Sequence, residues 1–289
     1  MKHRFTLDGS AALEARIEQD MTLVCETVLS AVGSTNLAAI ILGGGYGRGE
    51  GGVYIEDGEE RPYNDYDFFV VTSHASRQKG MMLHRALAKV GESLYERVGI
   101  HVDFGKPFVR ATLSRLPYEL MLMELKAGHY VVYGPATILD SMPRYDSSRV
   151  PLHEGARLLM NRGVGLLLSR KKLRSGGEAL SDDDTAFVVR NVQKAVMAMG
   201  DVVLMREERY SPSYVERLRL FESADLRGIP DGDALRARYA ESIAFKLCPR
   251  HVWPPEATLG DWLEETIRLY GAIHLAFEQH RLTIEDMTW

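Results

Sequence analysis

The hydrophobic pattern of this chain changes near residue 140, and the change limits the folds that the chain can adopt. Before that point, short apolar runs at 37–42, 68–71, 100–104 and 130–133 alternate with segments of helical period at 10–32, 76–98 and 114–127. Alternation of this kind predicts a sheet packed against helices. Beyond Pro143 only helical periods remain, at about 150–173, 183–207, 212–224, 232–248 and 259–281. We therefore expect an α+β fold, with a mixed sheet and helices in residues 1–140 and an all-α domain in residues 141–289.

Length and charge agree with two folded domains and exclude several classes of protein. At roughly 150 residues per domain, 289 residues correspond to two domains, and 45% apolar residues can fill two cores. Forty acidic against thirty-five basic side chains leave a net charge of -5. Binding along nucleic acid needs a basic face, so this charge argues against it, while a single nucleotide in a pocket remains compatible.

Membrane insertion and disulfide bonding are also disfavoured. No run approaches the roughly 18 apolar residues of a membrane span, and the basic N-terminus leads into an acidic helical pattern rather than an export signal. Cys25 and Cys248 stand far apart, with no second cysteine or histidine at zinc-ligand spacing. We expect a reduced, cytoplasmic protein.

A glycine tract follows the first apolar run directly. Residues 43–52 contain seven glycines, which let a ligand approach the main chain and let backbone N–H groups turn toward an anion. A flexible turn is the alternative. The Gly-x-Gly-x-x-Gly pattern at 47–52 matches a dinucleotide fingerprint, but residues 53–58 predict a strand and a turn instead of the required helix. No Lys-Ser/Thr follows, so a P-loop is excluded as well.

Carboxylates at the start of the second apolar run form a candidate metal site. Asp65 and Asp67 are two residues apart in a strand pattern, so both side chains are expected on one face of the sheet. A divalent cation would relieve their repulsion; an acidic surface loop is the alternative. Asp103 lies inside the later run 100–104, where burial of an unpaired carboxylate is costly. A shared cation, a salt bridge or an edge position facing water would each account for it.

These motifs in this order resemble the nucleotidyltransferase superfamily of the DNA polymerase β type, in particular the aminoglycoside and minimal nucleotidyltransferases. The resemblance covers about residues 37–135 and rests on Gly44-Gly45, Gly47-Arg48-Gly49-Glu50, Asp65-Tyr66-Asp67 and Asp103. Three features depart from the family pattern. Gly45 and Asn64 stand where serine is usual, and the gap before Asp65 is lengthened by a hairpin-like insertion at about 53–62.

The resemblance implies an activity and a set of site residues. It implies a Mg²⁺-dependent nucleotidyltransferase (EC 2.7.7 class) that moves a nucleoside monophosphate, AMP from ATP in the first instance, to a hydroxyl of a small molecule or a protein. Asp65, Asp67 and Asp103 would hold two Mg²⁺ ions, and Asp103 would help to deprotonate the acceptor. Gly44, Gly45, Arg48 and Lys194 would bind the nucleotide.

The helical half and the departures leave alternatives open. Lys194 and Asp201 lie seven residues apart on one helix face, which is similar to a substrate-side domain but also fits an internal ion pair. The basic cluster 170–174 would fit a polyanionic acceptor or a solvated helix end. Because Gly45 lacks the hydroxyl of the usual serine, a non-catalytic nucleotide sensor or an antitoxin-like partner protein is the alternative function. The expected partners are the nucleotide and an unknown acceptor, and a protein target or a homo-oligomer is a further possibility.

Overall fold

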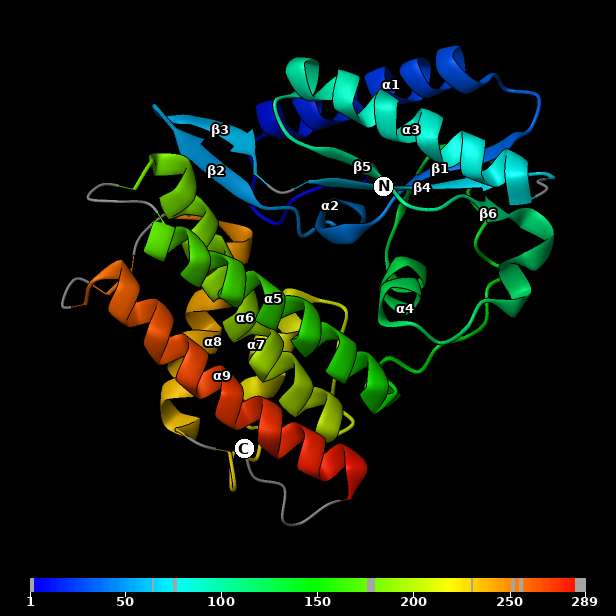
Figure 1. The fold of residues 1–289 in the computed structure, drawn as a ribbon. Helices are drawn as coiled ribbons and strands as arrows, with labels where there is room; N and C mark the ends of the chain where they lie inside the picture. The colour runs from blue at the N-terminus through cyan, green and yellow to red at the C-terminus, as the bar shows by residue number, and fades with distance from the viewer. Residues whose placement is uncertain are drawn as a thin grey trace. The chain divides into compact units, whose positions relative to one another are not determined.

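A computed structural model describes residues 3–63, 65–74, 77–175, 180–229, 231–250, 253–254 and 257–283 (Figure 1). The chain divides into two compact units, Met1–Tyr145 and Asp146–Trp289. This division lies close to the change of hydrophobic pattern near residue 140. The assignment of a catalytic and a substrate-side role to the two parts stays a prediction.

The first unit contains the alternating helices and strands that the sequence predicts. In chain order they are α1 (Ala11–Val32), β1 (Leu37–Leu42), α2 (Gly44–Arg48), β2 (Val53–Glu56), β3 (Glu59–Pro62), β4 (Tyr66–Thr72), α3 (Arg77–Val98), β5 (Val102–Phe104), β6 (Phe108–Val109), the 3₁₀ helix η1 (Arg110–Arg115), α4 (Leu120–Ala127) and β7 (Tyr130–Tyr133). The hairpin β2–β3 occupies the predicted insertion at 53–62.

The main sheet is mixed, as predicted. Its strands follow the order β5-β4-β1-β7, and β6 also pairs with β4. β1 runs antiparallel to β4 and β7, whereas β5 and β6 run parallel to β4. Strand β1 is therefore paired on both sides and buried on both faces, which explains its wholly apolar sequence.

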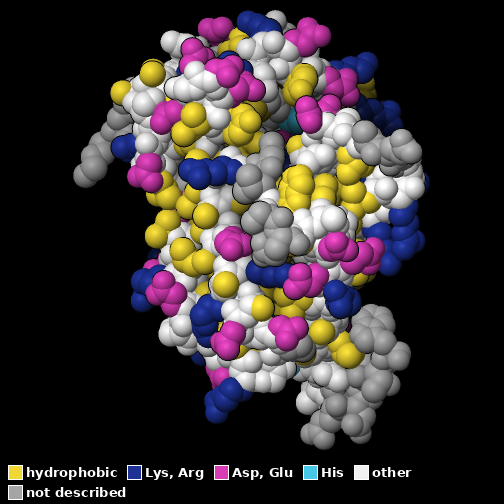
Figure 2. All heavy atoms as spheres, turned by 90° about the vertical axis from the view of Figure 1, so that its left-hand side faces the viewer, with side chains coloured by type: hydrophobic (Ala, Val, Ile, Leu, Met, Phe, Trp, Pro, Cys, Tyr) yellow, Lys and Arg dark blue, Asp and Glu magenta, His cyan; other side chains and the backbone are white. Residues whose placement is uncertain are grey.

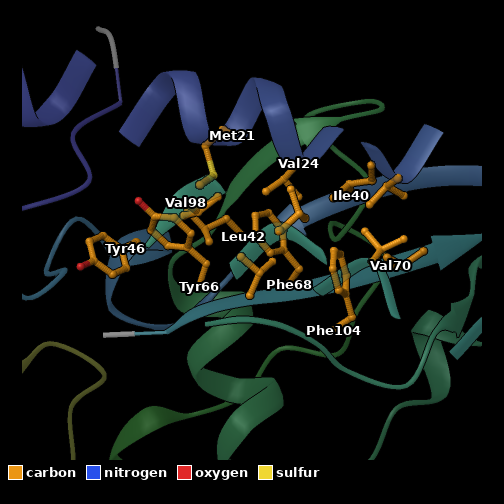
Figure 3. Close-up of a cluster of buried hydrophobic side chains, with 14 of the residues drawn as sticks. Met21, Val24, Ile40, Leu42, Tyr46, Tyr66, Phe68, Val70, Val98 and Phe104 are labelled. Carbon is orange, nitrogen blue, oxygen red and sulfur yellow. The ribbon is translucent and has the colours of Figure 1, made fainter. Parts of the chain in front are cut away.

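Each face of this sheet carries its own apolar core, because side chains alternate along a strand. On one face Leu42, Tyr66 and Phe68 pack against α1 and α3, and Figure 3 shows Met21 and Val24 of α1 directed at them. The opposite face packs Ala39, Ile41, Phe69 and Val71 against Leu122 and Leu125 of α4. The face that α4 covers is also the face on which Asp67 lies, since Asp67 and Phe69 are two residues apart.

Helix α1 shows how local signals set an element's limits. The Ser10 side chain accepts a hydrogen bond from the Leu13 N–H at 3.3 Å, which caps the first turn. Five apolar residues at three- and four-residue spacing are buried, as the helical pattern predicts: Leu13, Ile17, Met21, Val24 and Val28. At the other end, Gly33 adopts φ 73° and stops the helix.

Two segments of the first unit differ from the sequence predictions. The helix expected at 114–127 is α4, which begins only at Leu120 and follows η1. Pro117 accounts for the break, because it disfavours the helical conformation of the residue before it. The glycine tract contains the five-residue helix α2, an element that the sequence pattern did not predict.

The second unit is helical in its described part. It comprises the 3₁₀ helix η2 (Ser147–Arg149) followed by α5 (Leu152–Ser175), α6 (Asp182–Arg206), α7 (Tyr214–Glu222), α8 (Gly232–Leu247) and α9 (Leu259–Leu282). Helix α6 is the centre of this unit: it packs against the other four α-helices and is buried without interruption from Ala195 to Met205. Within the described residues, every helix is too short or too polar to cross a membrane.

Candidate active site

Two of the predicted carboxylates lie side by side on adjacent strands. Asp67 of β4 and Asp103 of β5 are direct partners in the parallel pairing, and both are exposed. Adjacent strands run about 4.7–4.9 Å apart, so the two carboxylates share a small area of one sheet face. Their buried neighbours along the strands, Tyr66 and Val102, point to the opposite face. The juxtaposition follows from strand pairing, which sequence spacing does not reveal.

Asp65 is the third predicted carboxylate, and Asp103 lies on the edge strand of the sheet. Asp65 lies one residue before β4 begins and is exposed; Asn64 lies outside the described residues. Asp103 is exposed too, on β5 at the edge of the sheet. This is the edge position facing water, one of the three alternatives that the sequence left open, so the carboxylate is not buried. A cation shared by Asp103 stays a prediction.

The glycine tract meets the carboxylates at Asp67. The Gly43 N–H donates to the Asp67 carbonyl oxygen at 2.8 Å. Gly44 adopts φ +61°, and a Cβ atom there would lie 2.3 Å from Oδ2 of Asp67. Glycine suits this position because the backbone is left-handed, and a side chain here would have to displace the Asp67 carboxylate. The tract thus places main-chain atoms of Gly43 and Gly44 directly against β4, the strand that carries Asp67.

Gly45 stands where the resemblance predicts serine, and the structure provides a packing reason. A Cβ atom at Gly45 would lie 2.8 Å from the Glu50 carbonyl oxygen, and the Glu50 N–H donates to the Gly45 carbonyl at 2.8 Å. The main chain at Glu50 therefore occupies the space that a side chain at position 45 would need. Any phosphate contact at this position would come from the main chain.

The dinucleotide fingerprint in the tract is accidental, as predicted. Helix α2 ends at Gly49, which adopts φ 81°, and the next element is the strand β2. A Rossmann site needs a helix directly after the last glycine of its motif. The tract instead makes a tight reversal between β1 and the hairpin.

Arg48 is held on the side of α2 that packs against α4. Its side chain is 6% exposed, and its Nη1 lies 3.5 Å from Oε2 of Glu124. Gly128 packs so closely that a Cβ atom there would lie 2.6 Å from Cγ of Arg48. The ion pair with Glu124 could not be predicted from sequence. A phosphate contact by Arg48 stays a prediction.

The acidic group fits a metal ion that binds together with a ligand. Within the described ranges, no three or more His, Cys, Asp or Glu side chains lie close enough to form a metal site on their own. Mg²⁺ retains several waters and is usually held by one or two carboxylates together with substrate phosphates. Asp67 and Asp103 supply that number from adjacent strands. The donors present therefore suit Mg²⁺ carried in with a nucleotide.

The opposite face of β4 holds a buried polar pair next to the site. The Tyr66 hydroxyl donates to Oδ2 of Asp20 at 2.9 Å, and both side chains are buried. Burial raises the pKa of Asp20 and also raises the pKa of Tyr66 well above its usual value. Tyr66 therefore keeps its proton at neutral pH, and this hydrogen bond fixes β4 against α1.

Asp201, seven residues after Lys194 on α6, has buried partners within the second unit. Asp201 forms an internal ion pair with Arg217 of α7, with Oδ2 at 2.7 Å from Nη1, and accepts a hydrogen bond from the Tyr239 hydroxyl at 2.8 Å. The predicted alternative, an ion pair between packed helices, is confirmed for Asp201. Contact of Lys194 with a nucleotide stays a prediction.

The basic cluster at 170–174 forms the end of α5, and neighbouring helices neutralise part of it. Nε of Arg170 lies 2.6 Å from Oε1 of Glu264 in α9, and Lys172 pairs with Asp184 in α6. On the face shown in Figure 2, Lys and Arg side chains are interspersed with Asp and Glu. These contacts favour the solvated helix end over a polyanion site.

No protein-family model matches the chain, and no curated protein matches its sequence. Among solved structures, the chain is similar to a nucleotidyltransferase, the class that its motifs resemble. That protein is the spectinomycin adenyltransferase AAD(9) from Enterococcus faecialis, crystallised with ATP and spectinomycin. The match covers 88% of this chain and 99% of the other, with 13% sequence identity and a TM-score of 0.47.

Gly44→Ala tests the contact between the glycine tract and Asp67. We expect nucleotide transfer to fall by about 100-fold, because the new Cβ atom would displace the Asp67 carboxylate. Gly58→Ala is the matched control, since Gly58 also has a positive φ, +81°, but nothing within 4 Å of the added atom. Both variants should lose roughly 1–2 kcal/mol of stability from backbone strain. Equal kcat/KM values for the two variants would remove Gly44 from the site.

Proposed function

We propose that the chain is a Mg²⁺-dependent nucleotidyltransferase that transfers AMP from ATP to a hydroxyl group. The proposal is carried by one observation: Asp67 and Asp103 are exposed and in register on adjacent strands, and Asp67 lies against Gly44 of the glycine tract. Two exposed carboxylates so placed repel each other, and a divalent cation bound with a triphosphate would relieve that repulsion. Asp65, one residue before the same strand, would be the third ligand once the cation is bound, because in the described residues the three side chains do not form a site on their own.

In the proposed reaction the acceptor oxygen attacks the α-phosphorus of ATP. A bond forms between that oxygen and phosphorus, the bond from the α-phosphorus to the oxygen bridging to the β-phosphate breaks, and pyrophosphate leaves with the electron pair. Asp103 accepts the acceptor's proton, because it lies on the open edge strand where a second substrate can approach. Two Mg²⁺ ions, when bound, would activate the attacking oxygen and stabilise the leaving group.

The remaining residues are assigned to nucleotide binding. Main-chain N–H groups of Gly44 and Gly45 would face the phosphates, which is compatible with the lack of a side chain at Gly45. Arg48 would add a positive charge behind the tract, and Lys194 is assigned to the nucleotide on the resemblance alone. The paired state of the basic cluster on α5 favours a small molecule or a protein side chain over nucleic acid as the acceptor.

Pyrophosphate release tests the proposal. The purified chain is incubated with Mg²⁺ and α-labelled ATP, GTP, CTP or UTP, first alone and then with polyhydroxylated small molecules or with peptides containing serine, threonine and tyrosine. We expect label on an acceptor and an equal amount of pyrophosphate, both abolished by chelation of Mg²⁺. Nucleotide binding without release under every condition would support the alternative, a nucleotide sensor or antitoxin-like partner.

A further inference from the structure

Tyr46 connects the glycine tract to both ends of the β2–β3 hairpin. It is the one aromatic residue within the tract and is 1% exposed. Its hydroxyl donates to the Gly52 carbonyl at 2.7 Å and accepts from the Tyr63 N–H at 2.9 Å. Gly52 directly precedes β2, and Tyr63 directly follows β3. The hydroxyl therefore joins both ends of the hairpin, alongside the direct hydrogen bond from the Tyr63 N–H to the Gly52 carbonyl at 3.2 Å.

The chain around this hydroxyl is packed closely. A Cβ atom at Gly51 would lie 2.0 Å from Cδ1 of Tyr46, so the main chain crosses directly over the ring. The Gly51 N–H donates to the Phe5 carbonyl at 2.9 Å, which holds the crossing segment from its other side. The Tyr46 ring meets the Tyr66 ring edge-on, with centroids 5.0 Å apart (Figure 3). Rotation of the Tyr46 side chain is blocked by these contacts.

The position of Tyr46 relates it to the proposed ligands. It follows Gly45 directly, and its hydroxyl holds Tyr63, which is two residues before Asp65. Along the chain, Gly45 and Asp65 are separated by the whole hairpin. Across the hydroxyl the connection is shorter: one residue from Gly45 to Tyr46, the hydrogen bond to Tyr63, and two residues from Tyr63 to Asp65. Through this hydrogen bond the chain that follows the hairpin is held to the glycine tract, although the hairpin separates the two segments in the sequence.

We infer that Tyr46 is a positioning residue that sets Asp65 against the glycine tract. This inference rests on the proposed function, because it assigns Tyr46 to the same nucleotide site. The Tyr46 hydroxyl hydrogen-bonds to Gly52 and Tyr63, not to the proposed carboxylate ligands or to Gly44 and Gly45. It acts through the Tyr63 main chain, in the way that residues behind metal ligands orient them.

Tyr46→Phe and Tyr239→Phe form a matched pair for the test. Both tyrosines are almost fully buried, each substitution removes one hydroxyl, and the rings remain. The Tyr239 hydroxyl donates to Asp201 inside the helical unit. We expect Tyr46→Phe to raise the Mg·ATP concentration for half-maximal rate about tenfold, and Tyr239→Phe to leave it unchanged. Both variants should have lower melting temperatures, so a general loss of stability would affect them alike.

Hydrogen exchange provides a readout that does not need activity. In the wild-type protein the Tyr63 amide should be strongly protected, because its N–H donates to both the Tyr46 hydroxyl and the Gly52 carbonyl. Peptides covering 52–65 should exchange faster in Tyr46→Phe than in Tyr239→Phe. Rapid exchange of Tyr63 in the wild-type protein would overturn the inference even if the variant did not fold.

The two proposals fail in different ways. A wild-type protein that neither transfers nucleotide nor binds the Mg²⁺ complex of α,β-methylene-ATP would overturn the proposed function. An active wild type with equal half-saturating concentrations and equal exchange in the two variants would overturn the role of Tyr46 alone.

Discussion

Asp67→Asn is expected to lower nucleotide transfer by roughly a thousandfold while the protein stays folded. Asp67 is the central residue of the proposed site, because it is in register with Asp103 and lies against Gly44. Asparagine keeps the shape but loses the charge that would hold a cation. Metal-derived stabilisation of a transition state amounts to several kcal/mol, and roughly 4 kcal/mol corresponds to about a thousandfold in rate.

The measurement is kcat/KM for pyrophosphate release with saturating Mg²⁺. Asp57→Asn is the control, because Asp57 is an exposed aspartate of the same unit at the tip of the hairpin, with φ 52°, which asparagine tolerates. Circular dichroism and the melting temperature should match the wild type in both variants. Retention of more than a tenth of the activity by Asp67→Asn would exclude Asp67 as a metal ligand.

Asp201→Ala is expected to lower the free energy of unfolding of the helical unit by about 3–5 kcal/mol. Asp201 is 3% exposed and accepts hydrogen bonds from Arg217 and Tyr239, which are also buried. Arg217 further lies 4.9 Å and 4.4 Å from the ring centroids of Tyr210 and Tyr214. Alanine would take away the charge that neutralises a buried guanidinium, which water cannot replace at this depth.

Urea unfolding, monitored by circular dichroism, measures this loss. Glu216→Ala is the matched control in the same unit, because the ion pair of Glu216 with Arg219 is exposed and its removal should cause no resolvable change. The double variant Asp201→Leu with Arg217→Leu should recover much of the stability, since an apolar pair leaves no buried charge. A loss below about 1 kcal/mol in Asp201→Ala would show that water reaches Arg217.

Periodicity along the chain predicted most of the fold. The spacing of Leu13, Ile17 and Met21 gives α1 and its buried face, and the apolar run at 37–42 gives the doubly buried β1. These predictions succeed because a helix or strand repeats a local geometry, so each element's burial appears in its own residues. The start of α4 at Leu120 escaped prediction because the apolar spacing continues across Pro117.

The candidate site was only partly readable from the sequence. The carboxylates and glycines were recognisable from their order, but Tyr46 carried no signal beyond being an aromatic residue among glycines. Its role depends on Gly52 and Tyr63, at the two ends of a hairpin. The need for glycine at position 45 depends in the same way on the return of Glu50. Contacts between segments that are distant in the sequence produce no periodic pattern, so the sequence alone does not reveal them.

The sequence by itself determined that Asp67 and Phe69 share a sheet face and that the chain passes from alternating elements to helices alone. Both follow from periods of two and 3.6 residues, which are local. Only the tertiary structure decided that Asp103 lies beside Asp67 and that Gly44 contacts the Asp67 carboxylate. Strand pairing decides these contacts, because hydrogen bonds between β4 and β5 set the register of residues that the whole of α3 separates in the chain.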